Sequence, residues 1–442
     1  MKRVIQVVDI LLFYVLGPLI GLAGLCYIHA GRLFKKKALK NGSPINRLTF
    51  CIMDLEKEKN KNGIAEDMLL KGGISKQIAV FFDFESDADS SARITDEIIS
   101  YRFSIHKKSK LFSGGLRKTG DLVNLIKNIF FLLNIARREQ INCVESHEAV
   151  FLGFIGLIFS RALSVPFVLH LNTSYEMKHK GTGNVSVKFL RFRRIERWLE
   201  RLACRLSEVI VADRMFYKNL KSFPKECADK YVTTGVKVEA AHYALPETRQ
   251  NLKGSLRIDG GDAILYVGRL HPVKYVRDLI KMFRKVHAQN NKAFLLIAGE
   301  GVLESELKNM ANGYGFREKT LFLGPKTANE LADLFYTADV VVQPHGGQVL
   351  VEAALAGTPS VVYNFDWHGE FVQDGKMGFI VPFGDTDSLA ARTLELLSDK
   401  ERNRKMGTFS REVAVRCYSR ETSIENEKAI YMKLAGREKG KR

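Results

Sequence analysis

Apolar residues in the second half of the chain form short uninterrupted runs, separated by longer segments in which they recur every three or four positions. Short runs are typical of strands buried on both faces, and the longer period is typical of amphipathic helices. The predicted strands are Ala263–Val267, Ala293–Ala298, Thr320–Leu323, Val340–Val342, Ser360–Tyr363 and Phe379–Val381. Strands that alternate with helices predict a parallel sheet covered by helices.

The first half repeats this pattern. Its predicted strands are Leu48–Met53, Ile78–Phe84, Ile141–Glu145, Pro166–His170 and Val209–Ala212, with helices over Asp121–Arg138, Ala149–Ala162 and Lys188–Leu206. The two halves meet in the polar stretch Leu245–Asp262, which contains Pro246 and the pair Gly260-Gly261. We therefore expect an α/β protein with two Rossmann-like domains, residues 41–245 and 246–420, facing a cleft, followed by a C-terminal helix and basic tail over 421–442.

The N-terminal segment Ile10–Ile28 carries no charged residue. A helix of this length would span roughly the 30 Å core of a bilayer, so residues 1–40 are predicted to be a membrane anchor with a basic flank. Five basic residues follow the segment against two before it, which predicts that the later domains lie on the cytoplasmic face. Gly17-Pro18 leaves a kinked or re-entrant anchor open, and a cleaved signal peptide is the other alternative.

The net charge of +19 suggests an anionic partner, such as a membrane surface or a phosphorylated substrate. The segment Lys188–Leu206 adds a stripe of arginines beside its apolar positions, namely Arg194, Arg197, Arg201 and Arg205. The stripe is interpreted as a membrane or phosphate surface, or as the solvated face of a core-packed helix. No zinc-finger spacing or aromatic RNA-binding motif is present, so no nucleic-acid partner is expected. The six cysteines are scattered, which indicates neither a disulfide framework nor a structural metal.

Two loops carry the candidate chemistry of the second half. In the segment 340–363, a buried strand runs into a Gly-rich loop and a helix that begins near Glu352, with Gly347 and Gln348 in the loop. In Leu265–Lys274, a strand runs into Gly-Arg-Leu and then a helix, with Arg269 and Lys274 five residues apart. Carboxyl ends of parallel strands bind ligands, and helix N-termini with arginine favour a diphosphate.

Together with Ala298-Gly-Glu-Gly301 and Phe322-Leu-Gly324 in the same order, these motifs resemble the retaining GT-B glycosyltransferases of family 4, the glycosyl transferases group 1. The resemblance implies that Arg269 and Lys274 grip the diphosphate of a nucleotide-sugar donor, and that Glu352 faces the donor ribose. It also implies transfer with retention, without a metal and without a cofactor. Glu370 matches a further recurrent carboxylate, which predicts a donor-binding role.

Other candidate residues lie in the loop that follows Ser360–Tyr363 and in the first half of the chain. Asp366, Trp367 and His368 could stack on or bond to a sugar. His170 ends a buried strand, where the family carries its active-site histidine, and is predicted to be catalytic together with Glu352. His147 also follows a strand and is interpreted as an acceptor-side or structural residue.

One position departs from the family pattern. The first Glu of the donor motif has no counterpart, because Pro344 stands eight residues before Glu352. Gln343, His345, Gln348 or the Asp366 loop could replace it. We therefore expect a membrane-anchored glycosyltransferase with a lipid-linked saccharide or other glycolipid as acceptor. The alternatives are a silent nucleotide-sugar-binding scaffold of the same fold and a GT-B nucleotide-sugar epimerase.

Overall fold

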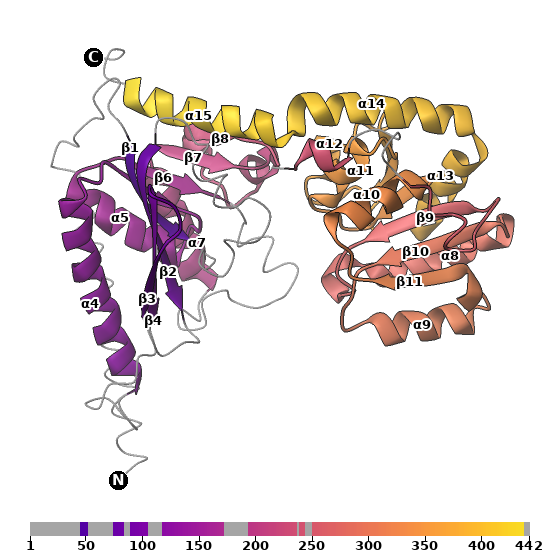
Figure 1. Ribbon diagram of the computed structural model, residues 1–442, viewed down its shortest axis with the longest axis horizontal. Coiled ribbons are helices and arrows are strands. Elements are labelled where there is room, and N and C mark those ends of the chain that lie inside the picture. Colours follow the sequence, from indigo (N-terminus) through magenta and orange to yellow (C-terminus); the bar gives the residue numbers. More distant parts are fainter. Residues whose placement is uncertain are drawn as a thin grey trace, which may run out of the picture. The chain divides into compact units, whose positions relative to one another are not determined.

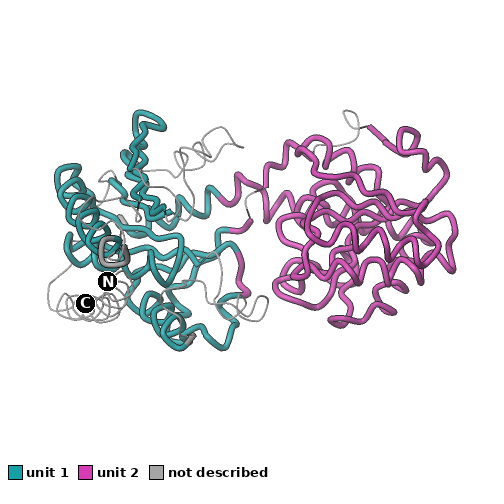
Figure 2. Tube along the Cα trace, turned by 90° about the horizontal axis from the view of Figure 1, so that it is seen from below, with its two compact units in different colours: residues 1–213, 217–234, 424–442 teal, residues 214–216, 235–423 magenta. Residues whose placement is uncertain are grey.

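The computed structural model describes residues 45–51, 74–83, 89–104, 117–171, 193–236, 238–243 and 250–436. The chain divides into two compact units (Figure 2). Unit 1 comprises residues 1–213, 217–234 and 424–442, and unit 2 comprises residues 214–216 and 235–423. Each unit is built on a mostly parallel sheet, which confirms the predicted pair of α/β domains.

The sheet of unit 1 has eight strands in the order β3-β4-β2-β1-β5-β6-β7-β8 (Figure 1). The strands are β1 (Ile45–Cys51), β2 (Ile74–Asp83), β3 (Ser90–Arg93), β4 (Ile98–Ser104), β5 (Cys143–Ser146), β6 (Phe167–His170), β7 (Val209–Ala212) and β8 (Tyr231–Thr233). Neighbouring strands are parallel except for the edge pair β3 and β4, which is antiparallel. The sequence pattern missed β3, β4 and β8, because these strands are short or carry polar residues among their apolar ones.

Helices pack on both faces of the unit 1 sheet. They are α4 (Arg117–Arg138), α5 (Phe151–Leu163), α7 (Arg193–Leu206) and α15 (Arg420–Gly436). Gly156 lets α5 approach the sheet, since a Cβ atom there would lie 2.6 Å from the ring of Phe167. The end of α15 returns to unit 1, where Ile430, Tyr431 and Leu434 join the core formed by β1, β5, β6 and β7.

The sheet of unit 2 has six parallel strands in the order β11-β10-β9-β12-β13-β14. They are β9 (Asp262–Val267), β10 (Ala293–Ala298), β11 (Thr320–Gly324), β12 (Val340–Gln343), β13 (Ser360–Tyr363) and β14 (Gly378–Val381). Strands β9, β10 and β11 are labelled in Figure 1. The main helices are α8 (Val276–Gln289), α9 (Glu304–Gly313), α10 (Ala328–Thr337), α11 (Val349–Leu355), α12 (His368–Phe371), α13 (Thr386–Ser398) and α14 (Lys400–Tyr418). Successive strand residues enter different cores, with Ile264 in one and Leu265 in the other, so both sheet faces are covered.

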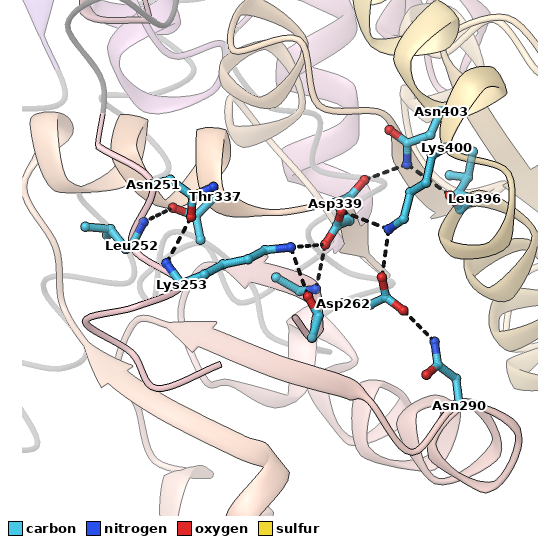
Figure 3. A network of polar contacts seen from close by, with 12 residues as sticks. Asn251, Leu252, Lys253, Asp262, Asn290, Thr337, Asp339, Leu396, Lys400 and Asn403 are labelled. Carbon is cyan, nitrogen blue, oxygen red and sulfur yellow. Dashed lines mark hydrogen bonds and ion pairs between the residues drawn. The ribbon is translucent and has the colours of Figure 1, made fainter. Parts of the chain in front are cut away.

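The boundary of unit 2 lies earlier than the sequence indicated. The polar stretch after residue 250 packs onto unit 2, since Leu252, Leu256 and Ile258 contact its core. Lys253 Nζ also bonds to Asp339 at 2.9 Å (Figure 3). The main segment of unit 2 runs from Gly235 to Ser423. These contacts are long-range, so the local rise in polar and glycine content after residue 250 does not mark the boundary between the units.

The predicted membrane segment Ile10–Ile28 and the basic tail Arg437–Arg442 lie outside the described residues. Across the described part of the chain, every helix is too short or too polar to cross a bilayer. The membrane anchor therefore stays a prediction from the sequence.

Candidate active site

The loops with the predicted donor-binding residues follow two adjacent strands of unit 2. From β9 the chain moves outward in one direction to β10 and β11, and later returns beside β9 to form β12, β13 and β14. The point between β9 and β12 is thus the place where the strand order reverses. In open α/β sheets, ligands bind outside the carboxyl ends of the strands at this point. Arg269 and Lys274 follow β9, and Gly347 and Gln348 follow β12.

Hydrogen bonds join these two loops. Lys274 Nζ donates to the carbonyl oxygen of His345 at 3.3 Å. The His345 ring lies with Nδ1 2.7 Å from the carbonyl oxygen of Val273, and because a carbonyl only accepts, Nδ1 carries the proton. Gln343 Nε2 donates to the carbonyl oxygen of Val267 at 2.9 Å. The structure therefore brings Arg269 and Lys274 to the same edge as the Gly-rich loop.

The Gly-Arg-Leu loop rests against the Ala-Gly-Glu-Gly turn after β10. Gly299 has φ +137°, and a Cβ atom there would lie 2.0 Å from the carbonyl oxygen of Gly268. Gly301 has φ +157° and faces Leu270 in the same way, at 2.5 Å. Only glycine fits two backbones this close, so the second motif supports the position of Arg269.

Positive charge accumulates around Lys274. Burial and the neighbouring charge of Arg269 lower the pKa of Lys274, and Arg214 acts in the same direction, while Asp366 opposes them. Arg269 itself is exposed. A bound anion would relieve this repulsion, so the group has the electrostatics of a phosphate site. The sequence analysis missed Arg214, which lies just before a 3₁₀ helix, η3 (Met215–Asn219), far from the donor motifs in the chain.

Glu352 lies on α11, where its backbone N–H donates to the carbonyl oxygen of Gln348 at 3.1 Å. Its side chain is partly exposed, and burial of the carboxyl group raises its pKa to about 7, against the effect of a hydrogen bond with Tyr243. Tyr243 ends the 3₁₀ helix η5 (Ala240–Tyr243). A carboxyl group with this pKa exchanges its proton near neutral pH, and a ribose contact from it stays a prediction.

The loop after β13 holds the Gly-rich loop in place. His368 accepts from the N–H of Gly346 at 3.0 Å and lies 2.8 Å from the carbonyl oxygen of Tyr363, while Trp367 Nε1 donates to the carbonyl oxygen of Gly346 at 3.3 Å. Both side chains are buried, and burial lowers the pKa of His368 to about 4, which keeps its ring neutral. These contacts position the loop, and direct contact between the 366–368 triplet and a sugar stays a prediction.

Asp366 and Glu370 make charged contacts within unit 2. Asp366 has φ +55°, and its Oδ2 lies 3.4 Å from His345 Nε2. Burial raises the pKa of Asp366, but His345 and Arg214 outweigh it and keep the pKa below its ordinary value. Glu370 accepts from the backbone N–H groups of Met215 and Phe216 at 2.5 and 2.7 Å. Glu370 thus anchors the start of η3, and its predicted role as a donor ligand is not tested by this arrangement.

Unit 1 contains a second cluster, at the carboxyl ends of β5 and β6. His170 is buried at the end of β6, with Nε2 2.5 Å from Oε1 of Glu145. The Nε2 of His147 lies 3.0 Å from the same oxygen. The two imidazole rings stack with centroids 4.4 Å apart and an interplanar angle of 5°. The two predicted histidines therefore lie together, and Glu145 joins them.

The cluster continues into the core through Arg47. Its Nη1 lies 2.6 Å from Oε2 of Glu145, and both side chains are fully buried. The sequence analysis did not select Glu145 or Arg47. A glutamate inside an apolar strand just before Ser146-His147 was a visible signal, but the contact with Arg47 joins strands far apart in sequence.

A metal ion could be considered for this cluster, since ligand atoms of Glu145, His147 and His170 lie within 4.8 Å of one another. Imidazole and carboxylate are suitable ligands for several divalent metals. The carboxylate of Glu145 also pairs with the guanidinium of Arg47, which neutralises its charge. The expectation of a metal-free enzyme stays a prediction.

The four predicted arginines lie along α7, and they differ in their contacts. Arg201 Nε donates to the carbonyl oxygen of Ser222 at 3.0 Å, and Arg205 Nε lies 2.7 Å from Oε1 of Glu226. Arg194 and Arg197 are exposed. Two large apolar side chains on the same helix, Ile195 and Trp198, are 40% and 46% exposed.

The C-terminal part of the chain matches a known protein family. Residues 248–413 match the family model of glycosyl transferases group 1. This range contains both donor-binding loops and most of unit 2.

Two curated proteins align with the chain over longer stretches than the family model does. The chain is 23% identical over 276 residues to the alpha-monoglucosyldiacylglycerol synthase of Streptococcus pneumoniae, which covers 60% of this chain and 61% of that enzyme. It is 24% identical over 298 residues to the UDP-Gal:alpha-D-GlcNAc-diphosphoundecaprenol alpha-1,3-galactosyltransferase of Escherichia coli, covering 64% and 73%. A shorter match, 26% identical over 172 residues, is to the N-acetyl-alpha-D-glucosaminyl L-malate synthase of Bacillus anthracis, and it covers 38% of this chain and 44% of that enzyme.

Among solved structures, the Anabaena protein HepE in complex with UDP resembles the chain with a TM-score of 0.67 and 15% identity. The match covers 88% of this chain and 100% of that protein. The likeness establishes the fold, which is that of the GT-B glycosyltransferases.

Proposed function

We propose that the protein is a glycosyltransferase that moves a sugar from a nucleotide-sugar donor to a lipid-linked saccharide or other glycolipid. The observation that carries the proposal is the meeting of Arg269 and Lys274 with the Gly-rich loop where the strand order of unit 2 reverses. Arg269, Lys274 and Arg214 raise the local electrostatic potential there, which favours binding of a diphosphate. The family match over residues 248–413 supports the same assignment.

The proposed reaction retains the configuration of the sugar. The bond between the anomeric carbon and the diphosphate breaks while the acceptor oxygen bonds to that carbon on the same face, and a donor phosphate oxygen takes the acceptor proton. Arg269 and Lys274 stabilise the negative charge that develops on the leaving diphosphate, which is the part that a divalent metal plays in other enzymes. The reaction is therefore proposed to be metal-independent.

His170 and Glu352 are proposed to act at different stages. Glu352 is proposed to bind the donor ribose hydroxyls from α11. His170 is proposed to contact the transferred sugar or the acceptor, because it lies at the carboxyl end of β6. Gly347 and Gln348 are proposed to present backbone donors to the nucleotide sugar.

A membrane-borne acceptor is supported by three independent features. The two relatives described above are named for a diacylglycerol product and an undecaprenol-linked substrate. The helix α7 exposes Ile195 and Trp198 beside Arg194 and Arg197, a composition typical of helices that lie on anionic bilayers. The apolar segment Ile10–Ile28 would place the enzyme at the cytoplasmic face.

The proposal is tested by a transfer assay with the full chain in its native membrane fraction. UDP-, GDP- and ADP-linked radiolabelled sugars are supplied in turn, and label that moves into the organic-solvent extract is measured. We expect one donor class to label a lipid, and Lys274→Ala to lower the rate of labelling by roughly ten- to a hundredfold. Failure of all donors to label any extractable product would contradict the proposed function.

One observation favours the scaffold alternative. Pro344 occupies the region where the family carries a sugar-binding Glu, so the sugar could be bound without being positioned for transfer. The scaffold would bind a nucleotide sugar through Arg269 and Lys274 but catalyse neither transfer nor hydrolysis. The same assay, combined with a binding measurement, separates the two possibilities.

A further inference from the structure

Tyr275 stands between Lys274 and the helix α8 in a backbone conformation that tyrosine rarely adopts. Its φ is +53° and its ψ is 32°, in the left-handed region, which glycine enters freely and a residue with a Cβ atom enters only at a cost. Its backbone N–H donates to the carbonyl oxygen of Pro272 at 3.0 Å and closes the 3₁₀ helix η7 (Pro272–Lys274). Residues in such conformations persist only where the surrounding structure fixes them, and they cluster at functional sites.

The ring of Tyr275 lies among three other aromatic rings. Its centroid is 5.0 Å from that of Phe383, 5.6 Å from that of Phe365 and 6.2 Å from that of His345. The rings of Phe365 and Phe383 are 4.9 Å apart, and those of His345 and Phe365 are 5.0 Å apart. Centroid separations of about 4.5–7 Å are those of attractive aromatic pairs. These four residues therefore form one aromatic cluster.

The aromatic cluster joins four loops at the carboxyl edge of the unit 2 sheet. Tyr275 follows β9, His345 follows β12, Phe365 follows β13 and Phe383 follows β14. Phe365 also packs against the core of unit 2, which anchors the cluster to the sheet. The cluster therefore ties the loop that carries Lys274 to the three loops beside it.

His345 connects the aromatic cluster to the donor-binding loops. Its Nδ1 lies 2.7 Å from the carbonyl oxygen of Val273, and its own carbonyl oxygen accepts from Lys274 Nζ at 3.3 Å. Tyr275 directly follows Lys274 in the chain, and its ring packs beside the ring of His345. Both residues that make the Lys274–His345 hydrogen bond are thus held by Tyr275, one through the backbone and the other through its ring.

We propose that Tyr275 is a positioning residue for donor binding, whose ring holds the loops after β9 and β12 together so that the ammonium group of Lys274 is in place for the diphosphate. The consequence for donor binding rests on the proposed function, whereas the coupling between the two loops does not. A role in packing alone would lower stability without acting through Lys274. The two roles therefore differ in measurable ways.

Hydrogen exchange in the ligand-free full chain tests the coupling between the loops. Backbone exchange is followed by mass spectrometry in peptides that cover residues 343–348, where no residue is substituted. We expect exchange there to be roughly two- to tenfold faster in Tyr275→Gly than in wild type, and Tyr275→Phe, which keeps the ring, to restore the wild-type rate. Glycine suits a φ of +53°, so Tyr275→Gly removes the ring without straining the backbone. Equal rates in Tyr275→Gly and wild type would overturn the proposal.

A double-mutant cycle tests the consequence for the donor. Isothermal titration with UDP, GDP and ADP is carried out on Tyr275→Gly, Lys274→Ala and the variant that carries both substitutions. We expect Tyr275→Gly to weaken diphosphate binding by roughly two- to tenfold, with no further loss when it is added to Lys274→Ala, because the ring acts through the ammonium group. Tyr314→Ala is the matched control, since the ring of Tyr314 stacks on Phe316 between α9 and β11 and should leave the affinity unchanged. Additive losses in the double variant would overturn the proposal.

The outcomes remain separable from those of the proposed function. If wild type binds none of the three diphosphates, the proposed function fails, whereas the exchange comparison alone confirms or refutes the coupling of the loops. If Tyr275→Gly does not fold, Tyr275→Leu, which keeps an apolar side chain without a ring, replaces it in both experiments with the same expectations. A lower stability of the variant with unchanged exchange over residues 343–348 and unchanged diphosphate affinity would show a purely structural role and overturn the proposal.

Discussion

Lys274 Nζ donates a hydrogen bond of 3.3 Å to the carbonyl oxygen of His345, and thereby joins the loops that follow β9 and β12. The same ammonium is held near Arg269, and burial together with that neighbouring charge lowers its pKa. The side chain of Lys274 is therefore held in place before a ligand binds. Its repulsion from Arg269 is relieved when an anion binds, so the loop pair favours a diphosphate over a neutral ligand.

Activity is expected to survive removal of divalent metals. Arg269, Lys274 and Arg214 together supply the positive charge that a leaving diphosphate needs. Transfer rates are compared before and after dialysis against EDTA, with added Mg²⁺ and Mn²⁺ as controls. An absolute requirement for either metal would show that the cations of unit 2 do not neutralise the diphosphate.

Replacement of His170 should affect turnover more than donor binding. His170 lies in unit 1, whereas the donor-binding loops lie in unit 2. We expect His170→Ala to lower kcat by roughly 10²- to 10⁴-fold, the range for a general acid, base or orienting histidine, with an unchanged donor Kd. His242→Ala is the control, since His242 is an exposed histidine on η5. Wild-type turnover in His170→Ala would remove His170 from the mechanism.

Stability should depend on pH through Glu352. Its pKa in the folded protein is about 7, raised from 4.5 by burial. Between these values the unfolded chain has lost the proton and the folded protein retains it, so the free energy of unfolding falls as pH rises through this window. Because the side chain is partly exposed, we expect Glu352 to contribute a loss of about 2 kcal/mol from pH 5 to pH 8.

Urea unfolding of wild type and Glu352→Gln at pH 5 and pH 8 measures this effect. The neutral amide cannot titrate, so the variant should lose about 2 kcal/mol less than wild type over the same interval. Identical pH dependence in the two proteins would mean that Glu352 ionises normally in the fold.

The exposed face of α7 should contribute to membrane binding. Arg194→Glu, Arg197→Glu and Trp198→Ser combined should weaken binding to vesicles with anionic lipid, by roughly 1 kcal/mol for each positive charge removed. Flotation with the full chain is compared with a control that carries Arg404→Glu and Lys405→Glu, two exposed positions of α14. Equal flotation of the two variants would assign membrane affinity to other parts of the chain.

The sequence predicted the interior strands well, because strands buried on both faces are continuous apolar runs. Ala293–Ala298 and Ser360–Tyr363 have the same limits in the sequence pattern and the structure. The edge strand β3 was missed, since Ser-Ser-Ala-Arg has no apolar run and half of its residues are exposed. The order of the donor motifs predicted which loops would carry charge, and β9 and β12 do lie side by side.

The parts that the sequence could not supply depend on long-range contacts. Tyr431 meets Arg47 across 384 positions of the chain, so nothing local indicates that α15 returns to unit 1. The meeting of Glu145 with both histidines follows from the pairing of β5 with β6, which a linear pattern does not specify. The sequence analysis selected Trp367 because its ring could stack on a sugar. In the structure its side chain is buried and donates a hydrogen bond to Gly346.

The central claim is that the loops after β9 and β12 bind the diphosphate of a nucleotide sugar, and isothermal titration of UDP, GDP and ADP tests it most directly. We expect one of these to bind the wild-type chain, and Arg269→Ala or Lys274→Ala to weaken that binding by roughly ten- to a hundredfold, the loss of one charge-assisted hydrogen bond. Lys281→Ala, an exposed lysine of α8 that pairs with Asp278, should bind like wild type. Equal affinity in Lys274→Ala and wild type, or no binding of any of the three diphosphates, would contradict the claim.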